Sequence, residues 1–195
     1  MKKILFVFIL LVFALSMAAA QINEFSLGEW NDNIYTNDFL GIKFQLPEDW
    51  KRFSDEDLAQ VMNLGTELLN DDQKKLAELS KINSVSYMGA NNPATGDSIM
   101  VSSVKSIFDL TAEYFMNGVK TQLQALESID YEVSEISKEE LAGREYYVLT
   151  AKSEISGINL IQKFYVYKID KYFLEIVATT LRGEDAITEM MNAFE

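Results

Sequence analysis

The stretch YTNDFLGIKFQLPEDW, residues 35–50, shows how the chain begins to fold. Residues 34–36 and 42–46 each alternate apolar and polar side chains, which is the pattern of a strand with one buried face. Asn37 and Gly41 lie between the two runs, and both residue types favour turns. The segment therefore predicts an opening β-hairpin.

The predicted hairpin runs into Pro47-Glu48-Asp49-Trp50. Pro47 has no backbone N–H with which to continue a strand, and Trp50 offers a large apolar surface that can anchor the chain as it leaves the sheet. An aromatic strand, a Gly turn, a second strand and Pro-x-x-Trp together resemble the opening of PsbP-like domains. The element order expected over residues 34–195 is also similar to theirs.

The PsbP-like family includes the extrinsic photosystem II protein, a nuclear Ran-binding family and exported bacterial proteins of unknown role. Compartment and charge separate this chain from the first two groups, so it resembles the uncharacterised exported bacterial branch. The resemblance implies an α+β fold with an antiparallel β-sheet covered by helices. Its motif is a hairpin signature rather than an active site, so no binding residues are transferred from the family.

Four helices are predicted. Ser54 and an acid three positions later form a near capping box, and the apolar residues that follow recur at helical spacing over residues 54–69. A shorter helix is expected over 71–82. The main packing helix should occupy residues 111–128, and a final short helix should occupy 187–194.

The remaining segments are rich in β-branched and aromatic residues and predict strands. The tight turn at Asp170-Lys171 predicts that the last two strands form an antiparallel hairpin. With few parallel crossovers available, we expect one α+β domain over residues 34–195, built on an antiparallel sheet covered by helices. Besides the opening hairpin, the expected strands are residues 84–88, 98–104, 131–136, 143–151, 158–169 and 172–180.

The first twenty residues predict a signal peptide. Lys2 and Lys3 precede an apolar run over residues 4–20 that ends in three alanines, which places the expected cleavage before Gln21. The alternative is an uncleaved anchor, but the run is shorter than the roughly 20 residues that span a bilayer. A lipid-modified start would need a cysteine, and the chain has none. Residues 21–33 are expected to be a tether or an ordered lead-in whose end packs through Trp30.

Composition excludes several classes of function. The chain contains no histidine and no cysteine, so Ser-His-Asp triads, thiol nucleophiles and the usual zinc, copper or haem ligands are ruled out. Without residues 1–20, 15 basic and 30 acidic residues remain, a net charge of −15. Such a surface repels phosphate backbones and anionic lipid headgroups, so we expect no nucleic-acid partner. Once the apolar run of residues 4–20 is removed, we also expect no membrane span.

We expect neither a metal nor a cofactor. Asp55, Glu56 and Asp57 lie in the first turn of a predicted helix, where carboxylates oppose exposed N–H groups, and capping accounts for them. A cation site there would need ligands from elsewhere, since no EF-hand pattern of the form D-x-[DN]-x-[DN]-G occurs.

Residues 89–97 predict a long exposed loop, and loops carry recognition more often than their scaffold does. Its candidate recognition residues are Asn91, Asn92, Thr95 and Asp97. The alternative is a flexible connector without a binding role.

Tyrosines crowd the C-terminal strands, where one face of the sheet must be covered by helices. The other face could present Tyr146, Tyr165 and Tyr167 as an aromatic platform for a glycan or a peptide. The alternative is that these rings are cross-strand pairs that stabilise the sheet.

The leading hypothesis is therefore an exported, monomeric, non-catalytic binding or accessory module with an unknown protein, peptide or glycan partner. The alternative is a carboxylate-dependent hydrolase acting on envelope or dietary glycans, for which Glu145, Glu154 and Glu175 on predicted strands are candidates. Such an enzyme needs two acids that converge in a cleft. A third hypothesis is a structural stalk, which a deep pocket would contradict.

Overall fold

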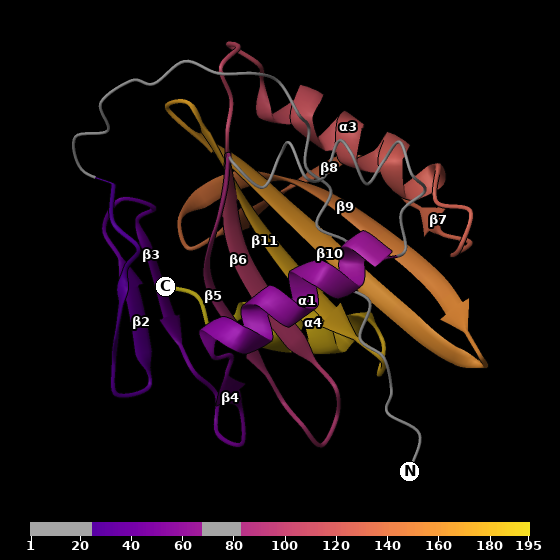
Figure 1. Ribbon diagram of the computed structural model, residues 1–195, viewed down its shortest axis with the longest axis horizontal. Helices are drawn as coiled ribbons and strands as arrows, with labels where there is room; N and C mark the ends of the chain where they lie inside the picture. The colour runs from indigo at the N-terminus through magenta and orange to yellow at the C-terminus, as the bar shows by residue number, and fades with distance from the viewer. Residues whose placement is uncertain (1–24, 68–82) are drawn as a thin grey trace.

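The computed structural model describes residues 25–67 and 83–195, which form two antiparallel sheets and three helices (Figure 1). The helices are α1 (Asp55–Glu67), α3 (Ala112–Gln124) and α4 (Glu184–Met191). The strands are β1 (Glu29–Asn31), β2 (Ile34–Asn37), β3 (Ile42–Gln45), β4 (Lys51–Arg52), β5 (Ser84–Asn91), β6 (Ser98–Lys105), β7 (Glu132–Val133), β8 (Ser137–Leu141), β9 (Arg144–Ile155), β10 (Ile158–Ile169) and β11 (Tyr172–Thr180).

The larger sheet has the order β4-β5-β6-β11-β10-β9-β7, and β8 pairs with the remaining length of β9. Every strand pair is antiparallel. The two-residue turn at Asp170-Lys171 joins β10 to β11, because Ile169 pairs directly with Tyr172. The predicted α+β class with an antiparallel sheet, and the predicted final hairpin, are both confirmed.

The opening hairpin is confirmed, and it belongs to a separate three-stranded sheet, β1-β2-β3. The third strand of that sheet, β1, comes from the expected lead-in. The Trp30 ring lies 5.4 Å from the Tyr35 ring and 6.3 Å from the Phe44 ring, centroid to centroid. The end of the lead-in is therefore ordered, and Trp30 packs onto the hairpin as expected.

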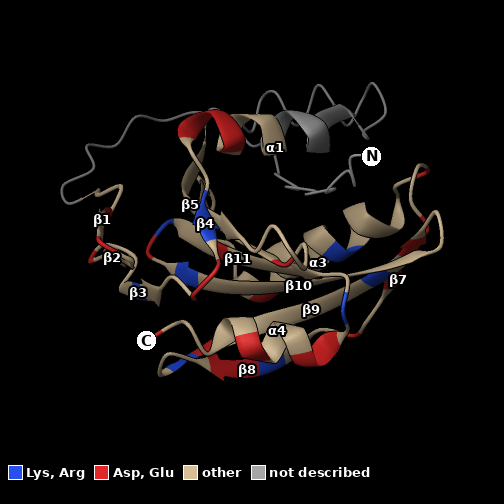
Figure 2. Ribbon diagram, turned by 90° about the horizontal axis from the view of Figure 1, so that it is seen from below, with Lys and Arg blue, Asp and Glu red and all other residues tan. Residues whose placement is uncertain are grey.

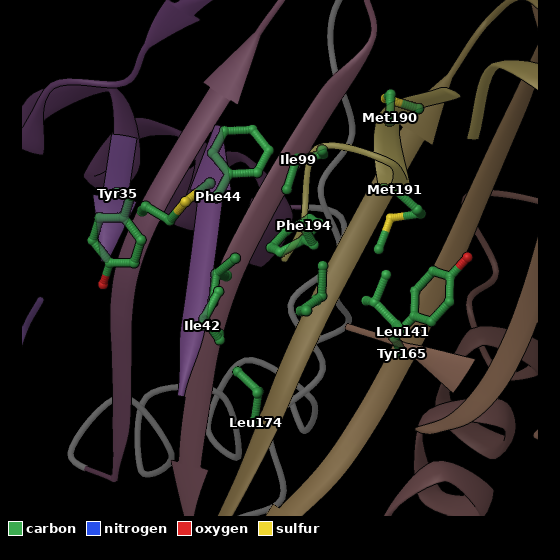
Figure 3. Close-up of a cluster of buried hydrophobic side chains, with 14 of the residues drawn as sticks. Tyr35, Ile42, Phe44, Ile99, Leu141, Tyr165, Leu174, Met190, Met191 and Phe194 are labelled. Carbon is green, nitrogen blue, oxygen red and sulfur yellow. The ribbon is translucent and has the colours of Figure 1, made fainter. Parts of the chain in front are cut away.

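Helices cover both faces of the larger sheet. Figure 2 shows α1 and α3 on one face and α4 on the opposite face. Under α3, the Phe115 and Phe173 rings stack 4.6 Å apart. On the other face, α4 and the opening hairpin enclose a second cluster that includes Phe44, Leu174 and Met190 (Figure 3). Side chains of β11 alternate between the two clusters, and all nine of its residues are buried.

The starts of α1 and α3 follow from their sequences. The Ser54 Oγ and N donate to Asp57 Oδ2 at 2.7 and 2.8 Å, which confirms the near capping box at α1. These hydrogen bonds lower the pKa of Asp57. Thr111 caps α3 by accepting a hydrogen bond from the Tyr114 N–H at 3.1 Å. The predicted helix over residues 71–82 and the signal peptide lie outside the described residues.

Several predicted segments differ from the structure. Strand β9 extends to Ile155 where the prediction ended at residue 151, and α4 spans Glu184–Met191 where the prediction was 187–194. Of residues 131–136 only the two of β7 are a strand, and the strand beside β9 is β8, which the sequence pattern does not predict. Its sequence, SKEEL, is charged and reads as a loop, yet it is typical of a protected sheet edge. The predicted loop over residues 89–97 was too long, because β5 extends to Asn91.

Across residues 25–67 and 83–195, no helix combines the length and the apolar character needed to cross a membrane.

Candidate functional site

The end of the predicted recognition loop is buried. Asp97 is 1% exposed and accepts hydrogen bonds from Arg182 Nε at 2.8 Å, Thr180 Oγ1 at 2.6 Å and Thr95 Oγ1 at 2.8 Å. Burial raises the pKa of Asp97, but the hydrogen bonds from Arg182, Thr180 and Thr95 outweigh it and lower the pKa overall. The prediction that Asp97 is an exposed recognition residue was wrong, because this carboxylate ties the loop to the end of β11.

The rest of the loop is a short turn. Asn92 Oδ1 accepts from the Ala94 N–H at 2.9 Å, and the Gly96 N–H donates to the Asn92 carbonyl at 2.8 Å. Asn91 pairs with Ser98 at the end of the β5–β6 ladder. Asn91, Asn92 and Thr95 are half-buried, and their recognition role stays a prediction.

Two of the three candidate tyrosines on β9 and β10 lie inside the molecule. Tyr146 and Tyr165 are 2% and 3% exposed, and the Tyr146 ring lies 6.3 Å from Tyr165 and 5.5 Å from Tyr167. Burial raises the pKa of Tyr146 and that of Tyr165. Tyr167 is half-buried beneath the Arg144 guanidinium, 5.5 Å from its ring centroid. An exposed platform was the wrong prediction for Tyr146 and Tyr165, because the hairpin and α4 cover this face.

The three candidate carboxylates of the hydrolase hypothesis are held in different environments. Glu145 forms an ion pair of 2.6 Å with Lys138 on the neighbouring strand. Glu154 is exposed and lines a cavity at the far end of β9. Glu175 is fully buried in the central strand β11. The structure does not bring these three side chains together in one cleft.

Glu175 is an unusual carboxylate. Neither of its oxygens makes a hydrogen bond of normal geometry, although Ser102 lies directly opposite it on β6. Burial raises its pKa to about 8, and the neighbouring Ser102 side chain opposes this rise. Glu175 therefore carries a proton at neutral pH and is part of the sheet interior.

A cavity of about 560 Å³ lies where β9 and β11 end and β10 begins. Tyr131 and Glu132 form one wall, Ser153 and Glu154 a second, and the chain from Leu181 to Gly183 a third. Residues 152–154 and 159–161 of the lining lie on the paired strands β9 and β10, which fixes the positions of this part of the cavity. Cavities of this size accept small ligands.

The lining of the cavity combines charges with apolar surface. Lys152 and Arg182 contribute cations, and Asp130, Glu132 and Glu154 contribute carboxylates. Apolar surface comes from Leu160, Ile161, Leu181 and the Tyr131 ring. The Tyr131 hydroxyl itself points to Gln162 Oε1, 2.7 Å away.

Within the described parts of the chain, no group of three or more acids is arranged to hold a metal ion. Of the three acids at the start of α1, Asp57 takes part in the cap through its hydrogen bonds with Ser54.

Sequence reasoning missed the cavity. Its lining comes from the segment after α3, from the β9–β10 hairpin and from the β11–α4 connection. The only sequence signal is a tyrosine-containing polar segment, residues 130–132, most of which the sequence predicts as the start of a strand. The register of β9 against β10, which sets Glu154 beside Asn159, is not readable from composition.

The sequence of this chain matches no known protein family and no curated protein. The solved structures that are similar to it in fold include the following three. LpqN of Mycobacterium tuberculosis, involved in cell envelope biogenesis, is 16% identical with a TM-score of 0.42, over 78% of this chain and 76% of LpqN. Cyanobacterial PsbP (CyanoP) from Synechocystis is 11% identical with a TM-score of 0.48, over 83% of this chain and 90% of that protein.

The third structure is a protein of Bacteroides thetaiotaomicron, 13% identical with a TM-score of 0.41. It covers 79% of this chain, which spans 44% of that protein. The PsbP-like fold expected from the hairpin motif is thus among the matched structures. At these identities the similarity concerns the fold alone.

Proposed function

We propose that this protein is an exported, non-catalytic binding or accessory module that acts outside the cytoplasm. The observation that carries the proposal is the cavity of about 560 Å³, which is framed by strand ends and by the β11–α4 connection. The leader pattern of residues 1–20, with cleavage before Gln21, supports the location. Because the chain contains no cysteine, its two apolar clusters form the core without disulfides.

The hydrolase alternative rests on the acids that line the same cavity. A glycosidase needs one carboxylic acid with a raised pKa beside the scissile bond. Among the acids in the described residues, Glu175 is the one whose pKa is clearly raised, and it is buried in the sheet instead of lining the cavity. The one acid with a raised pKa, Glu175, therefore lies apart from the cavity, and this separation favours a binding function over hydrolysis.

Ligand-induced thermal shifts test the binding function. The purified protein is screened against a fixed panel of soluble oligosaccharides and short peptides, and we expect at least one compound to raise its Tm. Asn159 is exposed and lines the cavity, so Asn159→Trp should abolish the shift by filling the cavity. Ile158→Trp is the matched control, because this exposed neighbour does not line the cavity.

A hydrolysis assay on the same oligosaccharides separates the two functions. If the wild type forms product and Glu154→Gln or Asp130→Asn does not, the protein is a hydrolase and the proposal of a non-catalytic binding module is wrong. Mass spectrometry of the exported protein tests location, and we expect an N-terminus at Gln21. Detection of the N-terminal residues 1–20 on the exported protein would show that the leader is not cleaved.

A further inference from the structure

Strand β10 extends beyond its neighbour β11 at one end of the large sheet. The last pair between the two strands joins Ile161 to Thr180, whereas β10 begins at Ile158. The first three residues of β10 therefore pair with β9 on one side only. The cavity lies at this step in the sheet, because residues 159–161 and residues 181–183 both line it.

The turn before β10 determines where the main-chain groups of the step point. Ser156 and Gly157 both have a positive φ, +54° and +80°, which is typical of the two-residue type I′ hairpin turn. The flanking residues Ile155 and Ile158 therefore exchange hydrogen bonds within the β9–β10 pair. Because this direction alternates along a strand, the N–H and C=O of Asn159 point to the other side, where β11 has already ended.

The chain that follows β11 is turned away from Asn159. If β11 continued in register, Arg182 would lie opposite Asn159. Instead, the Arg182 N–H donates to Thr180 Oγ1 at 3.0 Å, and its Nε donates to Asp97 at 2.8 Å. Among the described residues, no backbone group pairs with the N–H or C=O of Asn159. These two groups therefore form an open sheet edge beside the cavity.

The composition of this edge also favours the addition of a strand. Exposed sheet edges are commonly protected by charged side chains, as on β8, where residues 138–140 are all charged. The first three residues of β10, Ile158, Asn159 and Leu160, carry no charge. The step therefore lacks the feature that deters an incoming strand.

We propose that the cavity binds an extended peptide segment, which adds to the Asn159 edge of β10 in line with β11. One residue of that segment would exchange hydrogen bonds with the N–H and C=O of Asn159, as in strand addition at other sheet edges. Ile161 and Leu181 are half-buried and line the cavity, so they offer apolar surface to the side chains of the peptide. This inference rests on the proposed binding function and adds the chemical class of the ligand.

The test titrates the purified protein with an uncharged pentapeptide of alternating valine and threonine, acetylated and amidated at its ends. Amide hydrogen exchange is followed by NMR. We expect the saturating peptide to slow exchange of the Asn159 N–H at least about tenfold, because the docked strand would accept its hydrogen bond. Exchange of the Ile158 N–H, which already faces β9, should not change.

An N-methylated peptide tests whether the peptide main chain is what binds. Methylation of every backbone nitrogen removes the N–H donors and adds apolar surface. A peptide held by its main chain should therefore bind at least about tenfold more weakly after methylation, whereas a peptide held only by apolar contact should not. Affinity is measured from the amide chemical shifts of residues 181–183.

Two variants of Asn159 separate its main chain from its side chain. Asn159→Pro removes the N–H that the proposal requires and no hydrogen bond to β9, because this N–H faces away from β9. We expect it to weaken peptide binding about fivefold. Asn159→Ala keeps the N–H, so it should bind the peptide as the wild type does. The Tm of each variant shows whether it is folded.

Each outcome bears on a different claim. Unchanged exchange of the Asn159 N–H at saturation, equal binding of the methylated peptide, or unchanged affinity in Asn159→Pro would overturn the strand-addition inference. If oligosaccharides shift the cavity resonances and peptides do not, the binding function stands and only the ligand class is wrong. If no compound of either kind shifts them, both proposals fail.

Discussion

Arg144 Nη1 donates a hydrogen bond of 2.5 Å to the carbonyl oxygen of Leu40, which lies 104 positions earlier in the chain. The same guanidinium lies over the Tyr167 ring. One side chain of the large sheet thus holds the turn of the opening hairpin against the strands beneath it. The close approach is possible because the next residue in that turn, Gly41, has no side chain.

Gly41→Ala should destabilise the protein by more than backbone strain alone. Gly41 has a φ of +60°, and a Cβ there would lie 2.0 Å from Arg144 Nη2, so the guanidinium would have to leave its hydrogen bond with Leu40. We expect a loss of about 2–3 kcal/mol in the free energy of unfolding. Urea unfolding measures it.

Gly157→Ala is the control for the strain component. Gly157 has a φ of +80°, and a Cβ at this position would meet no atom within 4 Å, so only the left-handed backbone penalises alanine. That penalty is about 1 kcal/mol. Equal losses in Gly41→Ala and Gly157→Ala would mean that the Arg144 contact contributes nothing to stability.

Glu175→Gln should change how stability depends on pH. With a pKa of about 8 in the folded protein and an ordinary value of 4.5, Glu175 takes up a proton on folding between these limits. Its contribution is fully present below pH 4.5 and is lost as pH rises through about 8. From about pH 5 to about pH 9 the wild type should therefore lose on the order of 2–4 kcal/mol relative to Glu175→Gln.

Urea unfolding at several pH values measures this difference. Glu140→Gln, an exposed acid on the edge strand β8, is the control and should follow the wild-type pH dependence. A constant difference between wild type and Glu175→Gln across the range would show that this carboxyl group titrates normally.

Asp97→Asn should weaken the junction between β11 and α4. Its carboxylate accepts three side-chain hydrogen bonds while buried, so we expect a loss of about 1–3 kcal/mol near neutral pH. Because the pKa of Asp97 is lowered, the wild-type advantage is present above its ordinary value of 3.8 and is lost as pH falls through the folded-state pKa.

Thermal unfolding of the wild type and of Asp97→Asn measures this difference as a change in Tm. It is carried out at neutral pH and again in acid, below the ordinary pKa of an aspartate. Asp109→Asn is the control. Asp109 pairs with Lys168 but is exposed, so this substitution should change Tm little. A Tm for Asp97→Asn that equals the wild-type Tm at neutral pH would refute the role of this network.

The register of α3 can be tested with adjacent aromatic residues. Phe115 is 3% exposed and stacks on Phe173, so Phe115→Ala should cost about 3–5 kcal/mol. Tyr114 is 58% exposed, and Tyr114→Ala should change stability by about 0.5 kcal/mol or less. Similar losses in the two variants, measured by urea unfolding, would contradict the orientation of the helix.

The parts of the fold that sequence predicted are those governed by local patterns. The alternation at residues 34–46, the near capping box at Ser54 and the turn at Asp170-Lys171 each carry their own signal within a few residues. Fold class follows from them, because helices and antiparallel strands have few ways to bury their apolar faces together.

The predictions that were wrong concern residues whose environment is set by contacts with segments distant in sequence. Gly89 looks like a loop residue, yet a Cβ there would lie 2.3 Å from Phe53, so glycine is what lets the segment before α1 approach strand β5. The burial of Asp97 depends on Arg182, 85 positions later. Tyr146 and Tyr165 are hidden because the hairpin and α4 cover their face, which residue type alone does not reveal.

The bridge between Phe44 and Phe194 joins the first sheet to the last residues of the chain. Their rings lie 5.0 Å apart, and nearby Lys43 pairs with Glu195, 152 positions later. The hairpin is thus closed by a contact between residues 152 positions apart in the chain. Because loop-closure entropy makes such non-local contacts slow to form, we expect this junction to dock late in refolding.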